Sequence, residues 1–286
     1  MTENTWQRIE PVPAQRLKDA RRQAHNAVHW LARLANSYLE AGDDNRQFEL
    51  LWDDAACALR TRTFGPHLAV ELRLAELEVQ FCESGQPAPH ILALEERTPA
   101  HVEAWILVEL LHRGVDRDRF SKELPYPATD LMLGDHEEHE AETYKAELSA
   151  LNGWMRNAAA VLAVARQDIG RETGTDLSAQ PIVCWPQTFQ IGIEIPMPVG
   201  TAVDALRIGL SAGDALRPDP FFFAGTKAQA LSSDFDPSSV LSVQRIISED
   251  LDAAAVSTFL RGRAAAQRKM RASSALPVLP SQIVFG

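Results

Sequence analysis

Cysteine is scarce in this chain of 286 residues, which contains only Cys57, Cys82 and Cys184. Three cysteines at scattered spacings form neither a disulfide framework nor the paired Cys-x-x-Cys pattern of a structural zinc site. The composition therefore excludes a small scaffold held together by disulfides. We expect the protein to work in a reducing cytoplasm.

Long hydrophobic runs are also missing. No apolar stretch of the sequence approaches the roughly 18 residues of a membrane-spanning helix. The first residues, Met-Thr-Glu-Asn-Thr, lack the basic and apolar regions of a signal peptide. We therefore predict no membrane segment and a cytoplasmic location.

Lysine is rare, with five residues among 28 lysines and arginines, against 39 acidic residues and a net charge of −11. Nucleic acids and anionic membrane surfaces are bound by clusters of basic residues. The acidic balance argues against both partners and favours solubility. The chain also lacks a P-loop, a dinucleotide fingerprint and a nucleophile elbow, so the cofactor, if there is one, stays unknown.

Two kinds of hydrophobic periodicity run along the chain. Spacings of three and four residues, with capping signals, predict helices at 13–41, 98–112, 135–170 and 248–271. Alternating or continuous apolar runs predict strands at 48–60, 67–82, 181–195, 204–211 and 219–225. We predict an α+β fold in which helices cover an antiparallel sheet.

The order of these elements repeats, which bears on the domain organisation. We divide the chain into an N-terminal α/β unit at 1–114, a linker at 115–134 and a C-terminal α/β unit at 135–286, with one continuous domain as the alternative. An internal repeat of an α–β–β–α unit would align the strand of Trp52 with that of Trp185. The alternative is that the two halves share this order of elements by chance, as the halves of any α+β chain can.

Two motifs in the second half carry a family resemblance. They read Cys-Trp-Pro-Gln-Thr-Phe at 184–189 and Gly-Leu-Ser-Ala-Gly-Asp at 209–214, followed by an aromatic strand. They resemble uncharacterised bacterial proteins with Cys-Trp-Pro-His-His-Phe-Asp and Gly-Leu-Ser-Pro-Gly-Asp. The resemblance covers about residues 140–225 and implies a bacterial source and a similar fold, but no activity. Gln187, Thr188 and Gln190 replace the family's paired histidines and aspartate.

Four histidines have helical spacings that suit a metal ion. His25 and His29 are four residues apart in the first predicted helix, and His136 and His139 lie among glutamates where the third begins. Imidazoles at such spacings can bind one metal ion. The alternative is that the first pair borders the core beside Trp30, while the second occupies an ordinary acidic first turn.

The candidate ligand-binding residues lie around the two tryptophan strands. Trp52 and Trp185 are candidates for the wall of an apolar pocket, with Gln187, Gln190 and Asp214 as polar contacts. Core packing explains the tryptophans equally well. We therefore expect a non-catalytic protein that binds a small molecule or another protein, with a homodimer as one arrangement. The alternative is a metal-dependent hydrolase that uses the helix-borne histidines, so whether the protein is an enzyme stays open.

Overall fold

The computed structural model describes residues 6–40, 42, 46–199 and 202–274. Within these residues one antiparallel sheet has ten strands in the order β10-β9-β8-β7-β6-β1-β2-β3-β4-β5. The strands are β1 (Leu50–Asp53), β2 (Ala58–Arg60), β3 (Leu68–Arg73), β4 (Glu78–Glu83), β5 (Gln86–Ala93), β6 (Val183–Trp185), β7 (Gln190–Val199), β8 (Ala202–Ser211), β9 (Phe221–Thr226) and β10 (Val240–Ser242). The predicted α+β fold class is confirmed.

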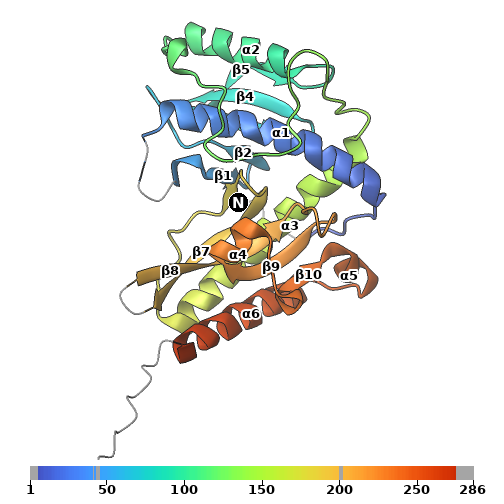
Figure 1. Cartoon of the computed structure of the whole chain (residues 1–286), viewed down its shortest axis with the longest axis vertical. Helices are drawn as coiled ribbons and strands as arrows, with labels where there is room; N and C mark the ends of the chain where they lie inside the picture. The colour runs from blue at the N-terminus through green and yellow to red at the C-terminus, as the bar shows by residue number, and fades with distance from the viewer. Residues whose placement is uncertain (1–5, 41, 43–45, 200–201, 275–286) are drawn as a thin grey trace, which may run out of the picture.

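Six α-helices accompany the sheet in the described part of the chain. They are α1 (Ala14–Tyr38), α2 (Pro99–His112), α3 (Lys145–Thr173), α4 (Lys227–Ser232), α5 (Val243–Ser248) and α6 (Ala253–Ser274). In Figure 1, α1 and α2 lie with β2, β4 and β5 in the blue-to-green half, whereas α3 and α6 lie in the yellow-to-red half. Thr98 begins α2 as predicted, because its side chain accepts a hydrogen bond from the backbone of His101 and Pro99 fills the first turn.

One face of the sheet carries the main hydrophobic core. Residues directly opposite each other on neighbouring strands have their side chains on the same face of the sheet, for example Leu59 with Leu72 and Cys184 with Ile191. These side chains belong to one buried cluster together with residues of α1, α2, α3 and α6. Since this core spans both predicted α/β units, they share a single apolar face.

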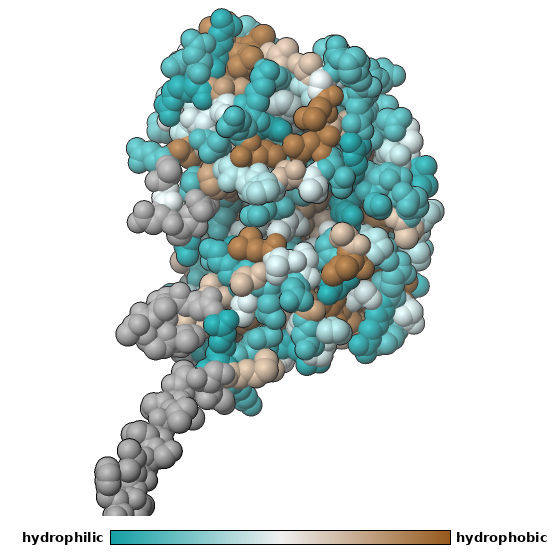
Figure 2. All heavy atoms as spheres, viewed as in Figure 1, coloured by the Kyte–Doolittle hydropathy of each residue, from teal (hydrophilic) through white to brown (hydrophobic). Residues whose placement is uncertain are grey.

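The opposite face differs between the two halves. Around β3 and β4 it is polar, and Arg73 bonds there to Glu71, Glu78 and Gln80. Around β6 and β9 it is aromatic, with a small buried cluster that includes Trp185 and is covered by α4. The face of the molecule in Figure 2 is mostly hydrophilic, and its hydrophobic residues form small separate groups.

The two halves of the sheet meet where β1 pairs with β6, so each half runs outward from the centre in chain order. The register does not align the two tryptophans. The β1–β2 and β6–β7 hairpins each enclose four loop residues, which places Asp53 and Trp185 at the same position. Trp52 thus corresponds to Cys184 and faces the helices, whereas Trp185 faces the other side. The duplication itself stays a prediction, as do the boundaries of the two units.

Two predicted helix starts are wrong. The capping box expected at Asp135 does not form, and α3 begins ten residues later, at Lys145. The backbone of His139 instead bonds to Glu96 and Arg97 in an extended segment. Ser248 ends α5, and Asp252 caps α6 by accepting a hydrogen bond from the backbone of Ala255 at 2.9 Å. Within the part of the chain described here, no helix is both long and apolar enough to cross a membrane.

Candidate functional site

A cavity of about 140 Å³ lies on the sheet face opposite the main core. The residues before β1, strands β6 and β8, helix α4 and the 125–126 loop contribute to its wall. The lining includes Phe48, Glu49, Tyr126, Trp185, Arg207 and Lys227. It therefore combines flat aromatic surfaces with charged groups, the combination that holds and orients a small ligand.

Trp185 and Arg207 line this cavity and contact each other. The Arg207 guanidinium carbon lies 4.1 Å from the centre of the indole ring, which is a cation–π contact. Arg207 also bonds to Glu194 on the neighbouring strand, with its Nε 2.8 Å from the carboxylate. The indole Nε1 of Trp185 donates to Glu49 at 3.2 Å. Both side chains are thus fixed before any ligand arrives.

Two cationic groups of the cavity keep unused hydrogen-bonding capacity. The Arg207 side chain is 4% exposed, yet its Nη1 has no hydrogen-bond partner among the described residues. Lys227 lies in the first turn of α4 and forms no ion pair with any of the residues that the structure describes. A buried donor without a partner costs about 1–3 kcal/mol, so a ligand acceptor at Arg207 Nη1 would relieve that cost.

The charge around the cavity is positive on balance. Three cationic side chains, Arg62, Arg207 and Lys227, stand against the two carboxylates of Glu49 and Glu194. Burial raises the pKa of Glu49, and the nearby Glu194 raises it further. Burial lowers the pKa of Arg207, although its pairing with Glu194 opposes this effect. Protonation of Glu49 would increase the positive balance.

A larger, open cleft of about 890 Å³ adjoins the cavity, and Gln187 and Leu231 line both. The first turns of α1 form one wall, with Lys18 and Arg21. Gly213, at φ +111°, leaves space for the Arg21 guanidinium, which donates to the carbonyl of Pro218 at 2.9 Å. The cleft is polar and provides room for the rest of a ligand whose charged end enters the cavity.

The predicted ligand-binding residues separate into two groups. Trp185 and Gln187 line the cavity, and Asp214 lines the cleft. The Asp214 carboxylate, however, accepts hydrogen bonds from its own turn, at the backbone of Leu216 and Arg217. The other two predicted residues, Gln190 and Trp52, lie elsewhere.

Gln190 and Trp52 lie outside both hollows. Gln190 is fully buried and donates from Nε2 to the carbonyl of Ala230 at 3.0 Å. Trp52 packs in the main core and donates from its indole to Asp54 at 2.7 Å. Their side chains contact α4 and the β1–β2 hairpin, and Gln190 Oε1 has no hydrogen-bond partner among the described residues. Ligand binding by these two residues stays a prediction.

The rings of His25 and His29 contact each other in α1 at an angle of 39°, with their centres 4.2 Å apart. His25 contacts Phe189 and bonds through Nε2 to the carbonyl of Pro186, while His29 bonds through Nδ1 to the hydroxyl of Tyr126. Burial is the main cause that lowers the pKa of His25 to about 4 and that of His29 to about 2. The pair supports the cleft wall as neutral aromatic rings.

His136 and His139 are held apart from that pair. His136 is 92% exposed and contacts Asp135, whereas His139 is buried and bonds through Nδ1 to the carbonyl of Arg97. No metal-sized group of three ligands within the described residues contains any of the four predicted histidines. The metal sites predicted at these positions therefore gain no third ligand.

Sequence reasoning missed Glu49, Arg207 and Lys227. One signal was available, because an arginine stands alone between apolar residues in the strand 204–211 and must find a partner if buried. The pairing of Arg207 with Glu194 depends on strand register, which alternation alone does not give. Lys227 enters the site only because α4 folds back over β8 and β9.

Fold and site together define an α+β protein. Its described residues form a ten-stranded antiparallel sheet with an aromatic, cationic cavity on the less covered face. Comparisons with protein-family models, with curated proteins and with solved structures gave no match for this chain. The resemblance to the bacterial Cys-Trp-Pro family stays a prediction.

Proposed function

We propose that this protein binds a small carboxylate ligand, with a flat apolar body, in the cavity formed by Trp185, Arg207 and Lys227, and that it does so without catalysis. The observation that carries the proposal is the buried Arg207 Nη1, which has no partner among the described residues. A carboxylate is the acceptor that guanidinium geometry recognises best.

Size and shape support the same ligand class. A cavity of 140 Å³ is close to the roughly 150 Å³ of an engineered apolar cavity that holds benzene. Trp185, Tyr126 and Phe48 offer aromatic walls to a flat group. The adjoining cleft accommodates polar substituents beyond the ring.

Benzoate is a suitable probe, with uncharged benzamide as its isosteric control. We expect the indole Nε1–H signal of Trp185 to shift saturably with benzoate in ¹H–¹⁵N NMR, and to respond at least tenfold more weakly to benzamide. Lys227→Met should weaken benzoate binding about tenfold, because a charge-assisted hydrogen bond contributes about 1.5–3 kcal/mol. Lys145→Met, at an exposed lysine outside both hollows, is the matched control and should leave benzoate affinity unchanged. Equal responses to both probes, or no effect of Lys227→Met, would refute the proposal.

Glu49 gives the proposal a second test, through pH. Its carboxylate repels an anion while charged, and its pKa is raised, so protonation removes that repulsion as the pH falls. We expect benzoate affinity to rise as the pH falls from 7.5 toward the raised pKa of Glu49. Glu49→Gln should bind benzoate about tenfold more tightly at pH 7.5 and show a flatter pH profile. A wild-type profile without slope would exclude Glu49 from the site.

Other parts of the expected function remain proposals. The three cysteines are all free, which supports a reducing cytoplasm. Protein binding and a homodimer are proposals that analytical ultracentrifugation tests directly. The hydrolase alternative would need the four predicted histidines to take up a metal. His25, His29 and His139 each bond through one ring nitrogen, to Pro186, Tyr126 and Arg97, and no group of three metal ligands among the described residues includes them.

A further inference from the structure

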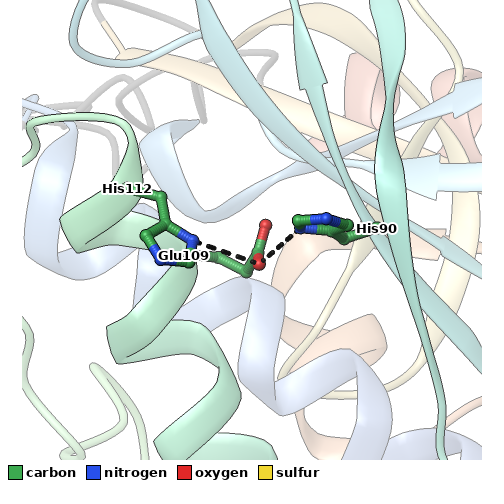
Figure 3. A group of neighbouring side chains, drawn as sticks. All are labelled: His90, Glu109 and His112. Carbon is green, nitrogen blue, oxygen red and sulfur yellow. Dashed lines mark hydrogen bonds and ion pairs between the residues drawn. The ribbon is translucent and has the colours of Figure 1, made fainter.

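A second group of chemically active side chains lies at the other end of the molecule, between α2 and the edge strand β5. Figure 3 shows Glu109 of α2 placed between the imidazoles of His112, from the same helix, and His90, from β5. One ligand atom from each residue lies within 4.8 Å of the other two. Among the described residues this is the one group of three with metal-ligand spacing.

The geometry points to a divalent transition-metal site: we propose that His90, Glu109 and His112 bind one Zn²⁺ ion. Glu109 Oε1 lies 3.1 Å from His90 Nδ1 and 3.9 Å from His112 Nδ1. Zinc bonds of about 2.0–2.2 Å at tetrahedral angles place neighbouring ligand atoms roughly 3.3 Å apart. Rotation of the two exposed histidine rings closes the remaining gap.

The carboxylate is held ready for a cation. The Glu109 side chain is 4% exposed, while those of His90 and His112 are 64% and 58% exposed. Arg113 bonds to the other carboxylate oxygen, Oε2, at 2.6 Å and leaves Oε1 directed toward the histidines. Partners that orient a ligand in this way are typical of metal sites.

Two further features favour a metal ion. Glu109 and His112 are three residues apart on α2, so they lie on one face of the helix. His112 is the last residue of α2, where the helix dipole favours positive charge. Two imidazoles and one carboxylate are the ligand set of zinc sites that keep a further coordination position open. The exposed histidines leave that position accessible to solvent.

This site is independent of the proposed carboxylate cavity. β5 ends the sheet, and four strands separate it from β6, whose Trp185 lines the cavity. Loss of metal binding and loss of benzoate binding are therefore separate outcomes that can be measured on the same variants.

The test uses the full chain, freed of metal with a chelator and titrated with ZnCl₂ by calorimetry. We expect one Zn²⁺ per chain, and His90→Ala and His112→Ala should each weaken zinc binding at least tenfold. Co²⁺ should give the visible absorption bands of a four-coordinate site in the wild type and lose them in both variants. Both histidines are exposed, so the variants should keep the wild-type circular dichroism spectrum.

His136→Ala is the matched control, since this exposed histidine lies outside the group and should leave zinc affinity unchanged. Cys57→Ser is a second control, for metal binding by the one cysteine that is not buried. Absence of saturable zinc binding would overturn the proposal. So would zinc binding that survives both His90→Ala and His112→Ala, or that is lost in either control.

Discussion

Gly192→Ala is expected to destabilise the protein by about 3 kcal/mol, at the upper end of the range for an overpacked site. Gly192 lies on β7, directly opposite Gly209 on β8, on the same sheet face as Trp185. A Cβ at Gly192 would stand 2.8 Å from Cζ3 and 3.0 Å from Cη2 of the Trp185 indole, and closer still to the carbonyl oxygen of Ile208. The added methyl group must therefore displace the indole or separate the strands.

The same substitution should abolish the response to benzoate, because the displaced indole forms one wall of the cavity. Urea denaturation gives the change in the free energy of unfolding, and NMR of the Trp185 indole gives the binding. Gly262→Ala is the matched control: this glycine lies in α6 with nothing within 4 Å of the added Cβ. It should stabilise the protein by about 0.5–1 kcal/mol, since glycine weakens a helix interior.

A double-mutant cycle identifies the cause. Trp185→Phe removes the indole atoms that Gly192→Ala would contact, so the double variant should be more stable than the sum of the two single effects by at least about 1 kcal/mol. Additive effects would assign the cost to the backbone contact with Ile208. A Gly192→Ala variant as stable as the wild type would mean that the indole is not held against β7.

The elements with strong local signals were predictable from the sequence. The apolar stripe of α1 and the Thr98–Pro99 start of α2 predict these helices with ends that differ from the structure by at most three residues. The apolar alternation over 67–82 changes phase near Ala75, which predicts a turn or bulge, and the β3–β4 hairpin turns there, with Arg73 opposite Glu78. These signals depend on residues that are close in sequence, so contacts between distant residues do not change the elements that they predict.

What the sequence did not reveal depends on contacts between distant residues. β5 contains Pro87 and Pro89, a pattern that is typical of a loop. The strand tolerates these prolines because it lies at the edge of the sheet. The acidic run at Asp135 has the pattern of a helix start, but pairing of His139 with Glu95 keeps the segment extended. Local propensity is weak against such tertiary hydrogen bonds.

The candidate sites show the same limit. Trp185 and Gln187, two of the candidate residues in the motif at 184–189, line the cavity. The alignment of Trp185 with Trp52 was wrong by one residue, and in a strand one residue moves a side chain to the opposite face. The proposed zinc ligands had one local signal, the spacing of Glu109 and His112. The third ligand, His90, lies on β5, a strand that the sequence pattern did not predict.

The histidine pair of α1 should make the protein sensitive to acid. The pKa of His25 is lowered to about 4 and that of His29 to about 2, mainly by burial, whereas an unfolded histidine titrates near 6.5. Below about pH 6.5 the unfolded chain therefore binds protons that the folded chain does not. The contribution of the pair to stability is complete above that pH and is lost as the pH falls toward the folded-state pKa values.

The expected loss is large. Each histidine contributes a slope of up to about 1.4 kcal/mol per pH unit, so the pair costs about 5 kcal/mol between pH 6.5 and 4.5. That is comparable to the whole stability of many domains, and we expect urea midpoints to fall steeply over this range. Carboxylates titrate there too, so the test compares variants rather than the wild-type curve alone.

His29→Gln keeps a polar group beside Tyr126 and removes one titrating ring. Its free energy of unfolding, measured by urea denaturation at several pH values, should fall with a slope smaller by about 1.4 kcal/mol per pH unit between pH 6 and 4.5. His136→Gln, at an exposed position, should retain the wild-type slope. If His29→Gln and the wild type have parallel curves, His29 is protonated inside the fold. The histidine pair beside Phe189 would then carry a charge, and the cleft wall would be cationic rather than neutral.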